Sequence, residues 1–151
     1  GLEYLDTKER RILYAVQFTI FASFLYAIFL PLRLGTIWFV TGLVIYLSGL
    51  ALATIAVLNF ASSPKSRPVT TGLYRVSRNP MYVGWLIMDV GLGIACTSWL
   101  YLALAAVLMI LFNAVLPSEE RWCLETYGDT YREYLNRTPR WIGMPESKKA
   151  D

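Results

Sequence analysis

The sequence predicts an all-α integral membrane protein, from its composition and from its long uncharged stretches. Of its 151 residues, 56% are hydrophobic and 17% are charged, whereas soluble domains average about 45–50% and about 25%. No charged residue occurs in 12–32 or 34–64, and residues 79–118 contain only Asp89. Since a membrane-spanning helix needs about 20 apolar residues, the third stretch is long enough for two helices and the whole chain for four.

We expect the four spans at about 12–31, 37–60, 80–96 and 99–116, within a single domain formed by residues 1–151. The third and fourth spans are separated at Cys96-Thr97-Ser98, and interfacial aromatic residues follow this break.

The basic residues predict the orientation of the chain in the membrane. All of the 14 basic residues except Arg33 fall before the first span, between the second and third, or after the fourth. Basic residues concentrate on the cytoplasmic side, so an even number of spans with both termini in the cytoplasm is predicted. The loop 61–79 and the tail 117–145 are then cytoplasmic as well.

The tail is expected to form an amphipathic helix rather than a fifth span. Ser118 has the chemistry of a helix-starting residue, and two carboxylates would lie in the first turn. Apolar and aromatic residues then recur at helical spacing, interrupted by Gly128-Asp129. The ordered part is expected to end near Trp141, and residues 146–151 to fray. The recurring residues are Leu124, Tyr127, Tyr131 and Tyr134.

Several classes of function are excluded by what the sequence lacks. It contains no histidine, which excludes catalysis by histidine and metal binding by histidine. Its two cysteines are too few for a zinc cluster or a disulfide scaffold. Cys96 and Cys123 are expected on opposite sides of the membrane, where they cannot pair. A net charge of +3 with little soluble surface argues against nucleic-acid binding. We therefore expect neither a metal nor a nucleic-acid partner.

Asp89 is the one carboxylate inside a predicted span. An ionised carboxylate at mid-membrane costs about 2.5–3.5 kcal/mol, so such residues are candidates for function. It can equally tie helices together through hydrogen bonds. A small four-helix transporter or scaffold protein that uses Asp89 is therefore an alternative function.

Two polar clusters flank the third and fourth spans. Arg78 adjoins the free backbone N–H groups at the start of a helix that begins with Pro80, and this arrangement favours binding of an anion. The alternative is a basic cytoplasmic loop that only sets the orientation of the chain, followed by an ordinary helix. Glu119 and Glu120 could bind an ammonium group, or they could only stabilise the start of a helix through its dipole. Together the clusters could hold a zwitterionic ligand. Gly84 and Gly91 share a helix face, which suits helix packing or a flat ligand group.

These residues carry a resemblance to a known family. Residues 72–74 followed by Arg78-Asn79-Pro80-Met81-Tyr82-Val83-Gly84 resemble the signature G-x-Y … R-H-P-x-Y-x-G of the isoprenylcysteine carboxyl methyltransferases and phospholipid N-methyltransferases. Residues 119–134 resemble its second block, E-E-x-x-L-x-x-x-F-G-x-x-Y-x-x-Y, with Cys123 and Tyr127 at the leucine and phenylalanine positions. The resemblance covers about residues 69–141.

The resemblance implies an S-adenosylmethionine-dependent methyltransferase at the cytoplasmic membrane face, with a lipid or lipid-linked methyl acceptor. A phospholipid amine, an isoprenylcysteine carboxylate and a smaller lipophilic thiol or amine all remain open as acceptors. For an amine, Glu120 or Asp89 would be the catalytic base. The implied cofactor-binding residues are Tyr74, Arg78, Asn79, Pro80, Tyr82, Gly84, Glu119 and Glu120.

Two departures from the family pattern bear on the acceptor. Asn79 replaces the usual histidine, and an amide forms hydrogen bonds but does not titrate. Residues 113–116 lack the arginine that carboxyl-methylating members carry before the paired glutamates. This makes an isoprenylcysteine carboxylate a weaker candidate and leaves an inactive family member as a further alternative. The sequence does not predict an oligomeric state.

Overall fold

The computed structural model describes residues 5–143, which form helices and no strands, so the all-α prediction is confirmed. Residues 144–151, including the predicted frayed end, lie outside the described range. The elements are α1 (Thr7–Ala27), α2 (Ile37–Ala61), the 3₁₀-helix η1 (Gly72–Arg75), α3 (Pro80–Ala95), α4 (Trp99–Tyr127) and α5 (Asp129–Arg137).

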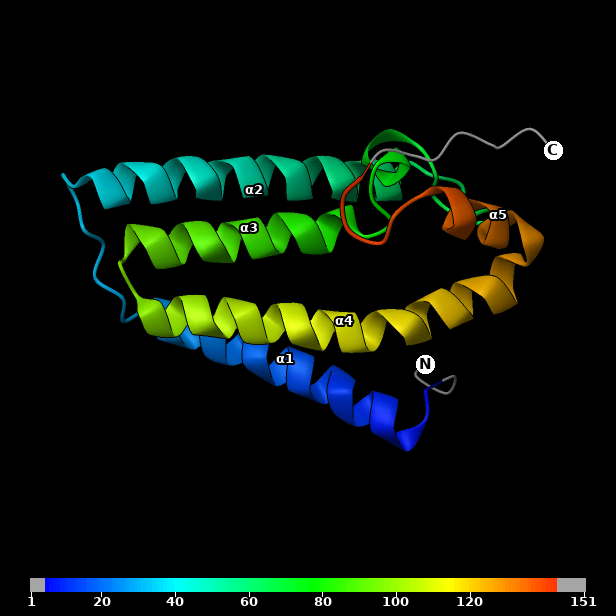
Figure 1. Cartoon of the computed structure of the whole chain (residues 1–151), viewed down its shortest axis with the longest axis horizontal. Helices are drawn as coiled ribbons and strands as arrows, with labels where there is room; N and C mark the ends of the chain where they lie inside the picture. The colour runs from blue at the N-terminus through cyan, green and yellow to red at the C-terminus, as the bar shows by residue number, and fades with distance from the viewer. Residues whose placement is uncertain (1–4, 144–151) are drawn as a thin grey trace.

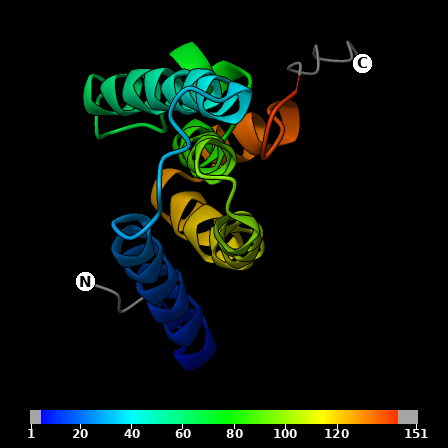
Figure 2. The ribbon, with the colours of Figure 1, turned by 90° about the vertical axis from the view of Figure 1, so that its left-hand side faces the viewer.

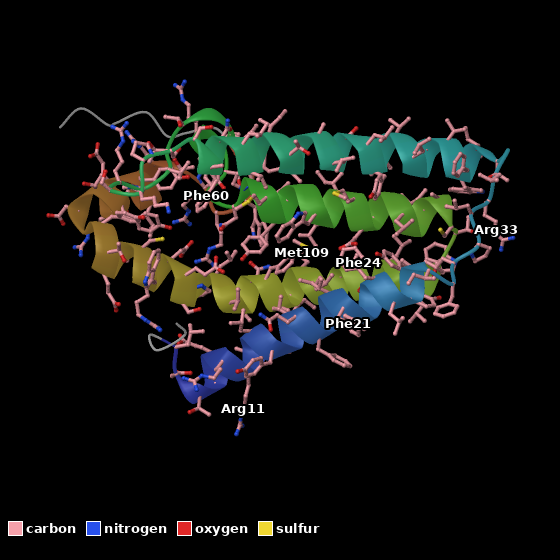
Figure 3. The ribbon with its side chains drawn as sticks, turned by 180° about the vertical axis from the view of Figure 1, so that it is seen from behind. Arg11, Phe21, Phe24, Arg33, Phe60 and Met109 are labelled. Carbon is pink, nitrogen blue, oxygen red and sulfur yellow. The ribbon has the colours of Figure 1, made fainter. Side chains whose placement is uncertain are left out.

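The four long helices pack in the spatial order α2, α3, α4, α1 (Figures 1 and 2). Helix α1 diverges from α4 toward its own N-terminus (Figure 1). The start of α1, the loop 62–79 and α5 lie at one end of the bundle, whereas the α1–α2 and α3–α4 connections lie at the other. Arg11 and Arg33 mark these two ends in Figure 3. Cys96 and Cys123 are unpaired, as predicted.

Small residues bring α2 and α3 close together. A Cβ atom added to Gly84 would lie 2.7 Å from the Ala53 backbone nitrogen, and one added to Gly49 would lie 2.6 Å from that of Met88. Membrane helices without bulky side chains at their contact approach closely in this way. The packing fixes the start of α3 beside the end of α2, and so holds the intervening loop over this end of the bundle.

Two helices differ from their predicted boundaries, and the first is the opening helix. It was expected at 12–31 but begins at Thr7 and ends at Ala27. The Asp6 carboxylate accepts a hydrogen bond from the Glu9 N–H at 2.7 Å, and the Glu9 carboxylate accepts one from the Asp6 N–H. This capping box starts the helix one turn earlier than the apolar pattern indicates. Pro31 disfavours helical backbone at the residue before it, so the predicted end was late.

The predicted break after residue 116 is also wrong, because α4 continues through Pro117 to Tyr127. Ser118 does not start a helix. It is buried, and its hydroxyl donates to the Val115 carbonyl at 2.7 Å. Buried neighbours such as Phe112 and Leu116 hold this part of α4 in place despite the hydrogen bond that proline removes. The chain turns instead at Gly128, whose φ of +58° favours glycine.

Helices α2 and α4 are each long and apolar enough to cross a membrane. Helix α3 has 16 residues and is about 24 Å long at ~1.5 Å per residue, which is shorter than a hydrocarbon core of about 30 Å. On α1, Phe18 is 73% exposed and Phe21 is 66% exposed, as suits a surface in contact with lipid. The structure thus supports a membrane protein, and the count of four spans remains a prediction.

Candidate functional site: a polar cavity at one end of the bundle

A cavity of about 370 Å³ lies where the loop 62–79, the start of α3, the end of α4 and α5 meet. Aromatic rings form about half of its wall, and Arg78, Glu119 and Glu120 supply its charges. The lining residues are Phe60, Pro68, Val69, Tyr74, Arg78, Asn79, Met81, Tyr82, Glu119, Glu120, Trp122, Cys123, Tyr127, Tyr131 and Tyr134.

Glu120 lies between two guanidinium groups. Arg140 donates to it through Nε at 3.1 Å and through Nη2 at 2.7 Å, a two-point contact that fixes both groups. Arg78 Nη2 is 3.4 Å from Glu120 Oε1, the oxygen that also accepts from Arg140 Nε. The side chains of Arg78 and Glu120 are only 10% and 12% exposed. Glu120 therefore holds the two arginines in place at the cavity.

Glu119 has different surroundings although it adjoins Glu120 in the chain. Its Oε1 accepts a hydrogen bond from the Tyr82 hydroxyl at 2.8 Å. The Tyr82 ring in turn packs against Phe112, with ring centroids 4.6 Å apart. No arginine or lysine of the described residues forms a salt bridge with Glu119. This carboxylate is consequently the one available to a cationic group in the cavity.

Three buried hydrogen-bond donors at the cavity have no partner within residues 5–143: Arg78 Nε, Arg78 Nη1 and the Tyr74 hydroxyl. Burial raises the pKa of Tyr74 to about 12, so its hydroxyl keeps its proton at neutral pH. Leaving a buried donor unsatisfied costs about 1–3 kcal/mol, and more for a charged group. Unpaired donors on residues that line one cavity indicate that the cavity binds an anionic or hydrogen-bond-accepting ligand.

The segment 138–143, here named the C-terminal strap, closes this end of the bundle. Its backbone pairs with the loop before α3, since the Arg78 N–H donates to the Pro139 carbonyl and the Gly143 N–H to the Val76 carbonyl, both at 3.0 Å. The Asn79 side chain donates to the Arg140 carbonyl at 3.0 Å. The strap therefore carries Arg140 to Glu120.

Six of the eight predicted cofactor-binding residues line this one cavity, all except Pro80 and Gly84. Pro80 is buried at the first position of α3, and Gly84 faces α2. Asp89, the other predicted catalytic candidate, lines a separate cavity and accepts a hydrogen bond from the Tyr101 hydroxyl at 3.0 Å. Sequence reasoning missed the contact of Arg140 with Glu120, because the two residues are 20 positions apart in the chain.

The fold and the site define a helical protein of membrane type whose polar cavity combines carboxylates with a partly unsatisfied guanidinium group. Comparison with known sequences agrees. The profile of the phospholipid methyltransferase family matches residues 30–130, about two thirds of the chain. The chain belongs to this family of methyltransferases.

Curated relatives include isoprenylcysteine methyltransferases. Protein-S-isoprenylcysteine O-methyltransferase B of Arabidopsis thaliana is 35% identical over 49% of this chain and 38% of its own length. A probable protein-S-isoprenylcysteine O-methyltransferase of Oryza sativa subsp. indica is 29% identical over 82% of this chain and 71% of its own length. The Homo sapiens enzyme is 29% identical over 55% of this chain and 30% of its own length. No solved structure matches.

Proposed function

We propose that this protein transfers a methyl group from S-adenosylmethionine to a lipophilic acceptor at the cytoplasmic membrane face. The observation that carries the proposal is the pair of buried, unpartnered N–H groups of Arg78. Arg78, Tyr74 and Glu119 all line the same cavity. Membership of a methyltransferase family supports the same conclusion.

The residues of the cavity fit the proposed cofactor. Its methionine part carries a carboxylate, which suits the free N–H groups of Arg78, and an ammonium group, which suits Glu119. Its adenosine part suits the aromatic wall that includes Tyr127 and Tyr131. The volume of about 370 Å³ lies within the roughly 300–1,000 Å³ of small-molecule sites.

The two glutamates have separate roles in this proposal. Both oxygens of Glu120 are engaged by arginines, so we assign it to positioning Arg78 and Arg140 rather than to proton transfer. Glu119 is the better placed group to take a proton from an amine acceptor, whereas a carboxylate acceptor needs no base. The cofactor supplies an electrophilic methyl group. The protein orients the reactants and excludes water, which accounts for much of the catalysis of such a displacement.

The acceptor is a lipid or a lipid-linked molecule that reaches the cavity from the bilayer. The family description favours a phospholipid amine, and the names of the relatives favour an isoprenylcysteine carboxylate. Residues 113–116 lack the arginine that carboxyl-methylating family members carry before the paired glutamates. The Asn113 side chain in this segment accepts a hydrogen bond from Trp141 Nε1 at 3.1 Å. We include both acceptor classes in the test.

We further propose four membrane crossings, with both termini and the cavity on the cytoplasmic side. The start of α1, the loop 62–79 and α5 already share one end of the bundle, and Arg33 lies at the other. The cavity formed by this loop and the tail would then open to the cytosol, from which the cofactor would enter.

The test is calorimetric titration of S-adenosylmethionine and S-adenosylhomocysteine into the purified protein. We expect saturable binding that Arg78→Ala weakens by more than about tenfold, because a charge-assisted two-point contact is lost. Arg75→Ala is the matched control, since Arg75 is exposed in the same loop and does not line the cavity. Transfer of labelled methyl groups to phosphatidylethanolamine or to a prenylcysteine then identifies the acceptor. Absence of cofactor binding by folded protein would reject the proposal.

A further inference from the structure

A second cavity, of about 330 Å³, lies among the four long helices. It shares no lining residue with the polar cavity at the end of the bundle. Asp89 lies ten residues beyond Asn79 along α3, about 15 Å at ~1.5 Å per residue, which places it within the membrane if the chain makes the four crossings proposed above. The lining residues are Ile20, Ser23, Phe24, Ala27, Tyr46, Trp85, Met88, Asp89, Leu92, Tyr101, Leu108 and Phe112.

The cavity has one charged residue, Asp89, in an otherwise largely apolar wall. Asp89 Oδ1 accepts the Tyr101 hydroxyl at 3.0 Å, and within residues 5–143 no cation pairs with this carboxylate. One neutral hydrogen bond compensates only part of the cost of an ionised carboxylate at this depth. A cation in the cavity would supply the missing partner.

Ser23 gives a second, independent sign of a ligand. Ser23 is buried, with only 4% of the residue exposed. Its hydroxyl has no hydrogen-bond partner in the described part of the chain. Serine in a helix commonly donates to the carbonyl four residues earlier, but here that bond is not made. The cavity thus holds an unpaired hydroxyl as well as a carboxylate without a cation.

Aromatic rings complete the chemistry of the cavity. Phe24, Tyr46, Trp85, Tyr101 and Phe112 all line it, and the faces of such rings attract cations. An anion would be repelled by Asp89, and a neutral alcohol would leave the carboxylate without a counter-charge. An organic cation with an apolar body satisfies all of these groups.

We propose that this cavity binds a compact lipophilic amine, with its ammonium group paired to Asp89 and its apolar body among the aromatic rings. The ligand enters from the bilayer, because Phe24 is 71% exposed and Trp85 is 42% exposed (Phe24 is labelled in Figure 3). The site does not depend on methyl transfer, which we assign to the other cavity.

The test compares 1-adamantylamine with the uncharged 1-adamantanol by calorimetric titration into the full chain in phosphatidylcholine nanodiscs, with protein-free nanodiscs as the blank. We expect saturable binding of the amine, and binding of the alcohol weaker by more than about tenfold, since the buried charge pair is absent. Asp89→Asn should weaken amine binding to a similar extent. Glu125→Gln, which removes an exposed carboxylate elsewhere on α4, should leave it unchanged. Equal affinities for amine and alcohol, or no effect of Asp89→Asn, would overturn the proposal.

A second variant keeps the carboxylate and blocks the space. Ser23→Leu places a larger apolar side chain in the cavity, so it should abolish amine binding while the affinity for S-adenosylmethionine stays that of the wild type. Circular dichroism confirms the helical fold of each variant. If folded Ser23→Leu protein binds 1-adamantylamine as tightly as the wild type, the ligand does not occupy this cavity and the proposal fails.

Discussion

At the scale of single residues, the site depends on how two adjacent carboxylates are partnered. Glu120 accepts a two-point contact from Arg140 and lies 3.4 Å from Arg78 Nη2, whereas Glu119 accepts the Tyr82 hydroxyl. The contact with Glu120 fixes the Arg78 guanidinium while its Nε and Nη1 stay unpaired. A charged group held in this way is organised in advance for an anionic ligand, which lowers the entropy cost of binding.

Tyr74→Phe tests the role of the unpaired hydroxyl. The change removes no hydrogen bond from the ligand-free protein, so we expect Tm to be unchanged or slightly raised. The affinity for S-adenosylmethionine should fall about fivefold to tenfold, as for the loss of one hydrogen bond of about 1–1.5 kcal/mol. Thermal unfolding and calorimetry measure the two effects.

Tyr134→Phe is the matched control for that variant. The Tyr134 hydroxyl donates to the Tyr74 carbonyl at 2.7 Å, so its removal should lower Tm. If Tyr74→Phe instead lowered Tm and left cofactor affinity intact, the Tyr74 hydroxyl would have a structural role in place of the binding role assigned here.

At the scale of elements, the uninterrupted helix α4 decides the geometry of the site. Because it continues through Pro117, Glu119 and Glu120 are successive helical residues that point about 100° apart around its axis. One carboxylate can therefore meet Tyr82 on α3 while the other meets the strap. Figure 1 shows α4 bending in its last turns toward α5, as expected of a helix that contains proline.

Gly49→Val tests the close packing of α2 against α3. Its Cβ atom would lie 2.6 Å from the Met88 nitrogen and 2.7 Å from the Gly84 carbonyl oxygen, both backbone atoms that cannot move aside alone. We expect a loss of at least about 1–3 kcal/mol of stability, seen as a lower Tm in detergent. Ser48→Val, on the exposed face of the same helix, should have little effect. Equal behaviour of the two variants would rule out this packing as the basis of the α2–α3 contact.

The contact between α1 and α4 predicts a dependence on pH. Arg121 donates to both oxygens of Glu9, each at 2.8 Å. These bonds, followed by that from the Asp6 N–H, lower the pKa of Glu9 from 4.5 to about 2. The pKa of Glu9 is lower in the folded protein than in the unfolded chain. The stabilisation by the Glu9–Arg121 pair is therefore complete above pH 4.5 and is lost as the pH falls toward 2.

Glu9→Gln should therefore lower Tm at neutral pH and flatten the dependence of Tm on pH below 4.5. The measurement is thermal unfolding at several pH values and low salt, because an exposed ion pair is screened by salt. Glu125→Gln serves as the control. A pH profile of Glu9→Gln that matches the wild type would show that this pair does not contribute to stability.

At the scale of the whole molecule, the local patterns predicted the helices better than their junctions. Apolar runs predicted α2 and α3 to within one residue at each end. The start of α1 depends instead on a capping box within a charged segment, and the passage of α4 through Pro117 depends on burial of its neighbours. The first feature is a local capping pattern from Asp6 to Glu9 and the second depends on tertiary packing, and the spacing of apolar residues indicates neither.

The site was predicted to the extent that its residues are contiguous in the sequence. The segments around Arg78 and Glu119 identified six residues that line one cavity, since each segment begins or extends a helix at the same end of the bundle. The contact of Arg140 with Glu120 depends on the strap pairing with the loop before α3, a long-range arrangement. Gly84 shares a helix face with Gly91, and only the structure shows that α2 covers it.

The most direct test of the central claim compares the affinities of S-adenosylmethionine and its decarboxylated analogue in wild type and Arg78→Ala. If the free N–H groups of Arg78 hold the cofactor carboxylate, the wild type should prefer S-adenosylmethionine by more than about tenfold. Arg78→Ala should bind both compounds with similar, weaker affinity, and Arg75→Ala should keep the preference. A wild type that binds the two equally, or an Arg78→Ala protein that keeps the full preference, would contradict the proposed site.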